Sequence, residues 1–287
     1  MNKKHFLFCI LLFMLIVYSC DKQSKKDIET PTKISAMTYN IRLDIKSDGI
    51  NQWDNRKEAI LSIIRNYKPT IIGIQEALPQ QVSYLQENLK QYGSIGEGRD
   101  GDVKGEACTI FYRSDQLQLL SKETFWLSET PKKPSIGWDA AYPRICTNGT
   151  FSQKNTHKKI NIYNTHLDHI GETSKLNSIK LIIKHIQKSN KQEASILMGD
   201  FNSLPNSTVV NYTRQHLSDS NIKQDATSIS SGTFNAFNIQ ETPKSRIDYI
   251  FSKNITLSSY KHLHTKTQEG NWPSDHIPIF VEMNFIN

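Results

Sequence analysis

The stretch Ser195-Ile-Leu-Met-Gly-Asp-Phe-Asn-Ser203 decides the fold of this 287-residue chain. Residues 195–198 form an apolar run that predicts a buried strand, and Gly199 ends it. Side chains alternate along a strand, so Asp200 and Asn202 would project the same way. Open α/β sheets hold their chemistry at the C-terminal ends of such strands. Taken alone, the stretch is equally compatible with an ordinary strand followed by an Asx-turn.

A basic start and a short apolar run predict an export signal over residues 1–20. Two lysines precede the apolar residues 6–19, and this run is shorter than the roughly 17–25 residues of a membrane-spanning helix. Small Ser19 precedes Cys20 in a sequence similar to the lipobox of bacterial lipoproteins. We therefore expect lipidation of Cys20 and a lipid anchor in the bacterial cell envelope, on the periplasmic or the outer face. Plain secretion and a retained anchor are the alternatives.

The rest of the chain is long enough for one large α/β domain. Residues 21–33 are polar and charged, which predicts a flexible tether, and residues 34–287 form the domain. The formal net charge is +7. This modest excess suits an anionic substrate such as a phosphate ester, and it lacks the dense basic stripe of a dedicated nucleic-acid binder. We expect a monomer.

Strands and helices alternate in the predicted order. Apolar spacing predicts helices at 53–67, from Pro79 onward, at 174–187 and at 205–216. Apolar and β-branched runs predict strands at 33–39, 70–74, 106–113, 117–127, 145–152, 159–165, 195–198, 246–251, 255–263 and 277–285. The mixture of hairpins and βα units favours two packed mixed β-sheets flanked by helices. Cys108 and Cys146 fall in predicted strands, where we expect buried free thiols; a disulfide is the alternative.

Polar side chains stand at the ends of several predicted strands. These are Asn40, Glu76, His166 with Asp168, Asp200 with Asn202, and Asp275 with His276. Asp248 lies inside an apolar strand, where a carboxylate is costly to bury unless it is paired. Each position alone has an ordinary structural explanation as a turn or a helix cap. Their joint placement predicts one shared site.

The residue types point to a reaction class. Carboxylate and amide oxygens are hard ligands that suit Mg²⁺, with Mn²⁺ as the alternative, rather than zinc. His166 and His276 could transfer protons or bind phosphate, and Asp248 could orient His276. The chain has neither a phosphate-binding P-loop motif nor a Gly-x-Ser-x-Gly motif. Metal-assisted attack of water on a phosphate ester fits the set best.

Together the motifs resemble those of the endonuclease/exonuclease/phosphatase superfamily, in the family's order and over residues 35–285. They are Thr38-Tyr-Asn40, Ile74-Gln-Glu76, Asn164-Thr-His166, Gly199-Asp-Phe-Asn202, Arg246-Ile-Asp-Tyr249 and Ser274-Asp-His276. The resemblance implies a four-layer α/β sandwich and one or two Mg²⁺ ions at Glu76, with Asn40 and Asp275 as further ligands.

The resemblance also implies roles for the remaining residues. Asp200 and Asn202 would hold the scissile phosphate and the attacking water. His276, paired with Asp248, would act as general base or phosphate ligand, and either Asp200 or His276 would take the proton. His166 would contact the phosphate or assist the leaving group.

Departures from the family's better-known branches narrow the substrate. Apurinic endonucleases tend to have Lys soon after Gln-Glu, where this chain has Ala77-Leu78-Pro79. Inositol 5-phosphatases tend to have Arg after Gly-Asp-x-Asn-x, where this chain has Ser203-Leu204. Arg144 and Asp168 are expected to contact the substrate, with a surface ion pair as the alternative for Arg144. Trp138, Tyr142 and Trp272 line the pocket or pack in the core.

The sequence therefore predicts an exported, lipid-anchored, Mg²⁺-dependent phosphoesterase that hydrolyses a phosphodiester. An extracellular nuclease acting on DNA or RNA is the first alternative. A phosphatase or phospholipase-type enzyme acting on sugar, inositol or lipid phosphates is the second. A non-catalytic lipoprotein that binds a ligand is the third, and it is disfavoured because every expected polar position is filled.

Overall fold

Two six-stranded sheets form the centre of the domain in a computed structural model that describes residues 33–189, 191–221 and 232–286. The strands of the first sheet lie in the order β11 (Ile255–His262), β12 (Ile279–Phe285), β1 (Lys33–Asn40), β2 (Ile71–Gln75), β4 (Ile110–Arg113) and β3 (Tyr92–Ile95). Those of the second lie in the order β5 (Leu117–Trp126), β6 (Ile145–Gln153), β7 (Lys159–His166), β8 (Ala194–Asp200), β10 (Asp248–Lys253) and β9 (Ser218–Asp219).

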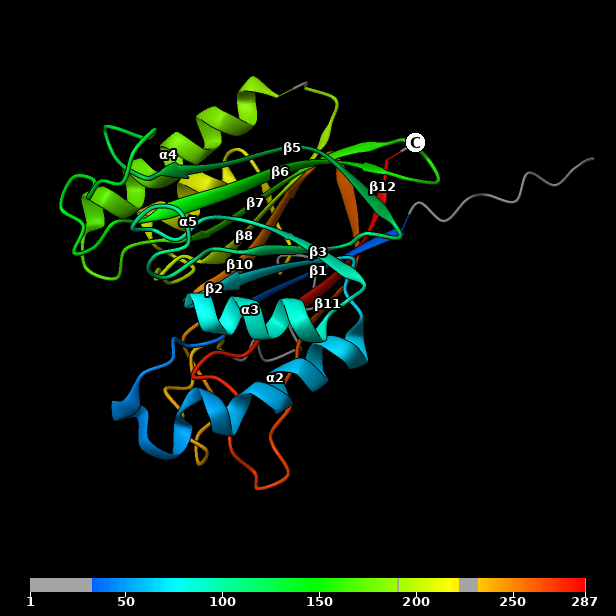
Figure 1. Cartoon of the computed structure of the whole chain (residues 1–287). Helices are drawn as coiled ribbons and strands as arrows, with labels where there is room; N and C mark the ends of the chain where they lie inside the picture. Colours follow the sequence, from blue (N-terminus) through cyan, green and yellow to red (C-terminus); the bar gives the residue numbers. More distant parts are fainter. Residues whose placement is uncertain (1–32, 190, 222–231, 287) are drawn as a thin grey trace, which may run out of the picture. The chain divides into compact units, whose positions relative to one another are not determined.

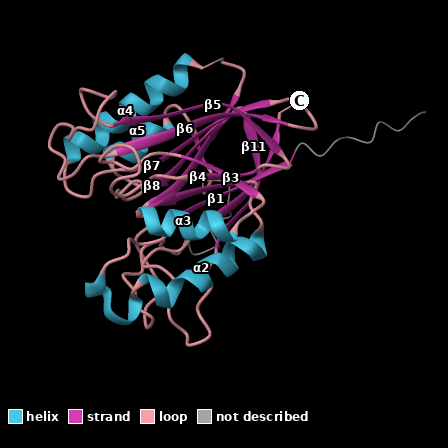
Figure 2. Ribbon diagram, viewed as in Figure 1, coloured by secondary structure: helices cyan, strands magenta, loops and turns pink. Residues whose placement is uncertain are grey.

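Helices cover the outer face of each sheet, so the domain has four layers (Figures 1 and 2). The helical segments are η1 (Lys46–Asn51), a short 3₁₀ segment, and α2 (Trp53–Tyr67), α3 (Pro79–Asn88), α4 (Glu172–Lys188) and α5 (Thr208–Arg214). Helices α2 and α3 pack on the first sheet, and α4 and α5 on the second. This arrangement confirms the predicted four-layer α/β sandwich of two mixed sheets.

The apolar pattern explains why these elements form. Ile60, Leu61 and Ile64 lie on one face of α2 and are buried against the first sheet. Strand β8 is buried along its whole length, because it runs through the middle of the second sheet with one face on α4 and the other on the first sheet. The core between the sheets includes Ile71 and Ile196.

Several strand bounds differ from those expected. The strand expected at 106–113 is shortened to β4, and the strand expected from 246 begins at Asp248. Strands β4 and β5 follow one another in the chain but belong to different sheets. Strand β3 has only four residues, three of them half-buried, and carries no clear alternation.

The two cysteines of the described region are free and buried, which confirms the expected thiols at Cys108 and Cys146. Burial raises the pKa of Cys108 to about 12. Within the described residues, no helix combines the length and apolar character needed to span a bilayer. The predicted signal peptide, Cys20 and residues 21–32 of the predicted tether lie outside the described residues, and Lys33 opens β1.

Candidate active site

Strand register brings the central polar residues together in the second sheet. His166 ends β7 and pairs with Asp200, which ends the parallel strand β8. Asp248 begins the antiparallel strand β10 and also pairs with Asp200. Three neighbouring strands therefore present a histidine and two carboxylates at one edge of the sheet.

The first sheet contributes to the same edge. Asn40, at the end of β1, donates from Nδ2 to Oε1 of Glu76 at 2.9 Å and to Oδ2 of Asp200 at 3.0 Å. Its own Oδ1 accepts the backbone N–H of Arg42 at 3.0 Å, which only the oxygen can do. Asn40 thus ties the carboxylates of both sheets together.

Asp275 and His276 reach the site from the loop before β12. Ser274 Oγ donates to the carbonyl of Asn40 at 2.7 Å and fixes this loop to β1. His276 Nδ1 lies 2.8 Å from Asp248 Oδ2, and its Nε2 lies 3.6 Å from Asp200 Oδ2. The expected pairing of His276 with Asp248 is therefore present.

Asn202 contacts both Asp200 and His166. Its backbone N–H donates to Asp200 Oδ1 at 2.9 Å. The Asx-turn expected from the sequence as an alternative is therefore present, and the same residues also belong to the site. Its Nδ2 donates to His166 Nε2 at 3.0 Å. Asn202 and Glu76 both adopt positive φ angles, of 46° and 63°. Strained backbone of this kind gathers at functional sites, where the surrounding structure holds it in place.

Electrostatics separates the roles of the titratable groups. Burial, together with the nearby Asp248 carboxylate, raises the pKa of Asp200 to about 7. Burial acts to lower the pKa of His276, but Asp248 and Asp200 outweigh it and hold that pKa well above its usual value. Burial and Arg144 hold the pKa of His166 well below its usual value. At neutral pH, His276 is therefore cationic and His166 neutral.

The acidic groups fit a divalent cation. Glu76, His166 and Asp200 offer ligand atoms within 4.8 Å of one another. Asp200, Asp248 and His276 are equally close, but the protonated His276 ring has no lone pair for a metal. Burial and the charge of Glu76 raise the pKa of Asp275. Closely spaced buried carboxylates with few cationic partners favour a bound cation. Metal coordination by Asn40 stays a prediction. Its Oδ1 accepts one backbone hydrogen bond, and an amide oxygen has a second lone pair.

Arg144 and Asp168 form a buried pair beside the site. Arg144 Nε lies 3.2 Å from Asp168 Oδ1. The Asp168 carboxylate also accepts the backbone N–H groups of Ala141, Ile170 and Gly171. Asp168 is fully enclosed, so it can act on a substrate only by positioning Arg144.

Three residues of this region gave no signal in the sequence. Arg56 of α2 is buried and donates hydrogen bonds to three backbone carbonyls in the loops of the site, those of Ile41, Arg42 and Pro273. Arg99 and Glu106 line a pocket next to His166 and belong to a glycine-rich stretch without strand or helix periodicity.

A four-layer α/β sandwich with this group of carboxylate, amide and histidine side chains defines a class of phosphate-ester hydrolases. The comparison with family models gives the specific assignment. Residues 37–276 match the endonuclease/exonuclease/phosphatase family. The chain belongs to this family, whose members depend on divalent metals.

Solved structures and sequence relatives agree with this assignment. A family protein from Bacteroides thetaiotaomicron is 35% identical, with a TM-score of 0.83, over 90% of this chain and 100% of that one. A mannosyl-6-phosphatase from the same organism is 35% identical, with a TM-score of 0.82, over 88% and 100%. An uncharacterised protein of Acanthamoeba polyphaga mimivirus is 32% identical over 163 residues, which are 54% of this chain and 60% of that protein. The chain spans less than two thirds of the length of such relatives found from sequence alone.

Proposed function

We propose that the chain hydrolyses a phosphate ester by in-line attack of a water molecule that Asp200 deprotonates. The position of Asp200 carries this proposal, since its Oδ2 lies 3.5 Å from His166 Nε2 and 3.6 Å from His276 Nε2. His276 is kept protonated by Asp248 and cannot accept a further proton. Asp200 is the remaining base, and the His276 cation would stabilise negative charge on the phosphoryl oxygens.

Glu76 would hold the divalent metal, with Asp275 as a second carboxylate and Asn40 positioning Glu76. Mg²⁺ is the expected ion and Mn²⁺ the alternative. The ion, when bound, would polarise the phosphoryl oxygen and favour the ionised form of water. Asn202 would then orient the phosphate, since its side chain contacts His166 and its backbone N–H donates to Asp200.

Hydrolysis of bis-p-nitrophenyl phosphate by the purified protein tests the reaction. We expect turnover with Mg²⁺, loss with EDTA, and loss in Asp200→Ala and His276→Ala with the fold intact by circular dichroism. Asp115→Asn, which alters an exposed carboxylate far from the site, is the matched control. Unchanged turnover in either site variant would contradict the assigned roles. A folded protein that binds phosphate esters without hydrolysing them would favour the ligand-binding alternative.

Two substrate classes compete. The relative named a mannosyl-6-phosphatase favours a phosphate monoester of a sugar. The sequence motifs favour a phosphodiester, with nucleic acid and the inositol and lipid phosphates as alternatives. A panel of hexose phosphates, inositol phosphates, plasmid DNA, RNA and phospholipid head groups, assayed with Mg²⁺, ranks them by kcat/KM. We favour the sugar monoester.

The proposed location is the bacterial cell envelope, through a lipid on Cys20. The support is the sequence around Cys20 alone. Metabolic labelling with a radioactive fatty acid should mark the wild-type chain and not Cys20→Ser. Light scattering of the protein should give the mass of the expected monomer.

A further inference from the structure

A small pocket lies directly beside the site. It is lined by Glu76 and His166 and by three residues of the adjoining loops, Arg99, Glu106 and Arg144. The space in it that a water-sized group can occupy is only about 10 Å³. That is room for about one water molecule or one hydroxyl group. A substrate can therefore place a single hydroxyl-sized group in this pocket.

The charges of the pocket are balanced. Arg99 Nη2 lies 2.7 Å from Glu106 Oε1, and Arg144 Nε lies 3.2 Å from Asp168 Oδ1. Each guanidinium therefore has its own carboxylate. A second phosphate group would need an excess of positive charge, whereas hydroxyl groups both donate and accept hydrogen bonds and suit paired donors and acceptors.

The pocket is preformed. Arg144 is 5% exposed, and the ring of Tyr142 lies 6.0 Å from its guanidinium carbon and 4.9 Å from that of Arg99. Trp126 Nε1 donates to the carbonyl of Arg99 at 2.7 Å and fixes the loop that carries it. Groups held in this way lose little freedom on binding, which favours affinity and specificity.

Donors are left over for a ligand. Among the described residues, none accepts a hydrogen bond from Arg144 Nη1 or from Arg99 Nη1. We propose that this pocket binds a hydroxyl group of the alcohol part of the substrate, which makes the substrate a phosphate ester of a sugar or a similar small polyol. This inference rests on the proposed function, and Arg99 and Glu106 are its specificity-determining residues.

The test compares hexose 6-phosphates with p-nitrophenyl phosphate, whose leaving group has no further hydroxyls. Loss of a charged hydrogen bond predicts that Arg99→Ala raises KM for the hexose phosphates by about 10–100-fold. Hydrolysis of p-nitrophenyl phosphate should change by less than about threefold, because its leaving group makes no such contact. Glu106→Gln keeps the shape of the pocket and should show the same selective loss.

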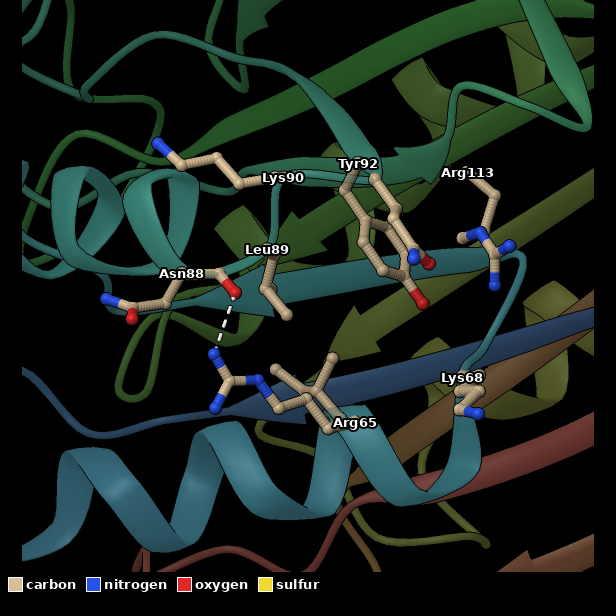
Figure 3. Close-up of a pocket in the computed structure, with 9 residues that line it drawn as sticks. Arg65, Lys68, Asn88, Leu89, Lys90, Tyr92 and Arg113 are labelled. Carbon is tan, nitrogen blue, oxygen red and sulfur yellow. Dashed lines mark hydrogen bonds between the residues drawn. The ribbon is translucent and has the colours of Figure 1, made fainter.

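Arg113→Ala is the matched control. Arg113 pairs with Asp115 at 2.6 Å, and its side chain is 14% exposed, against 16% for Arg99. Arg113 lines a cavity with Arg65, Lys68 and Lys90 (Figure 3). There the end of β4 lies beside the start of β2, whereas Glu76 follows the other end of β2. Arg113→Ala should leave both substrates unaffected.

The outcomes separate the two proposals. A wild-type protein that hydrolyses neither substrate overturns the proposed function, and this inference with it. A wild-type protein that hydrolyses p-nitrophenyl phosphate but no hexose phosphate overturns this inference alone. Equal losses on both substrates in folded Arg99→Ala and Glu106→Gln do the same, because they would show a structural role for the pair.

Discussion

Gln75 donates from Nε2 to Oδ1 of Asn164 at 2.6 Å, and this hydrogen bond joins the two sheets directly below the site. Gln75 precedes Glu76, and Asn164 lies two residues before His166. The Asn164 amide nitrogen also donates to the carbonyls of Ile74 and Thr109. One fully buried polar group therefore fixes the relative positions of the strands that carry Glu76 and His166.

Asn164→Leu should destabilise the protein. The substitution keeps the branched shape of the side chain but removes three buried hydrogen bonds. Each is worth about 0.5–1.5 kcal/mol, because Gln75 Nε2 and the Thr109 carbonyl keep other partners, at 3.1 and 2.8 Å. We expect the free energy of unfolding in urea to fall by more than about 2 kcal/mol. Asn148→Leu is the control, because in the described part of the chain the Asn148 side chain donates only to the carbonyl of Ile162. An equal loss in both variants would show that Asn164 has no special role between the sheets.

The same two residues show what the sequence could and could not predict. Strand ends were predictable, because the apolar runs stop at Asn40, Asp200 and His166, and parallel strands present such ends at one edge. The hydrogen bond between Gln75 and Asn164 was not, since it depends on how two sheets face each other. Pairing over long sequence separations leaves no local pattern.

Helices followed their local pattern most closely. The apolar spacing gave α2 its observed bounds, Trp53–Tyr67, and Pro69 explains its end. Arg99 and Glu106 were missed because a loop residue is placed by its tertiary contacts, here Trp126 and Tyr142. The structure brings the predicted site residues together, while their individual roles stay predictions.

Asp248→Asn should weaken catalysis through His276. A neutral amide no longer holds the imidazole protonated, so the pKa of His276 falls and its cationic form is lost at lower pH than in the wild type. We expect kcat to fall by about 10²–10³-fold, the range for loss of one group that stabilises transition-state charge. The high-pH limb of the rate profile should also move to lower pH.

A double variant separates this role from a structural one. If Asp248 acts through His276, Asp248→Asn combined with His276→Ala should be no slower than His276→Ala alone. Additive losses would place Asp248 in a role of its own. Thermal unfolding of all three variants checks that the fold persists.

Metal binding should release a proton below neutral pH. The pKa of Asp200 is raised to about 7 in the metal-free protein, so much of this carboxyl is protonated at pH 6. A nearby cation favours the carboxylate and lowers that pKa, so binding expels the proton. Calorimetric titration with Mg²⁺ in buffers of different ionisation enthalpy measures the number of protons released.

The way proton release changes with pH identifies Asp200 as its source. Release should be large at pH 6 and should decline by pH 8.5, where Asp200 is already ionised. Asp200→Asn cannot release this proton, so its binding enthalpy should depend less on the buffer at pH 6. The same buffer dependence in the wild type and in Asp200→Asn would mean that another group releases the proton, and His276 would be the first candidate.

Gly199 should tolerate no side chain. Its φ is +145°, and a Cβ there would lie 1.9 Å from the carbonyl oxygen of Thr165 on β7. That oxygen belongs to backbone in the centre of the sheet and cannot move aside. Gly199→Ala should therefore separate β7 from β8 at the point where His166 and Asp200 meet.

Gly270→Ala is the control that separates steric overlap from backbone strain. Gly270 has a φ of +83°, but a Cβ there would have no neighbour within 4 Å, so alanine meets only the strain of its backbone angle, about 1–2 kcal/mol. We expect folded, active Gly270→Ala protein with a slightly lowered melting temperature. Gly199→Ala should be insoluble or should melt far lower, with kcat reduced in any folded fraction. Equal melting temperatures in the two variants would mean that β7 and β8 can separate without loss, and that the close approach at Gly199 does not hold the site together.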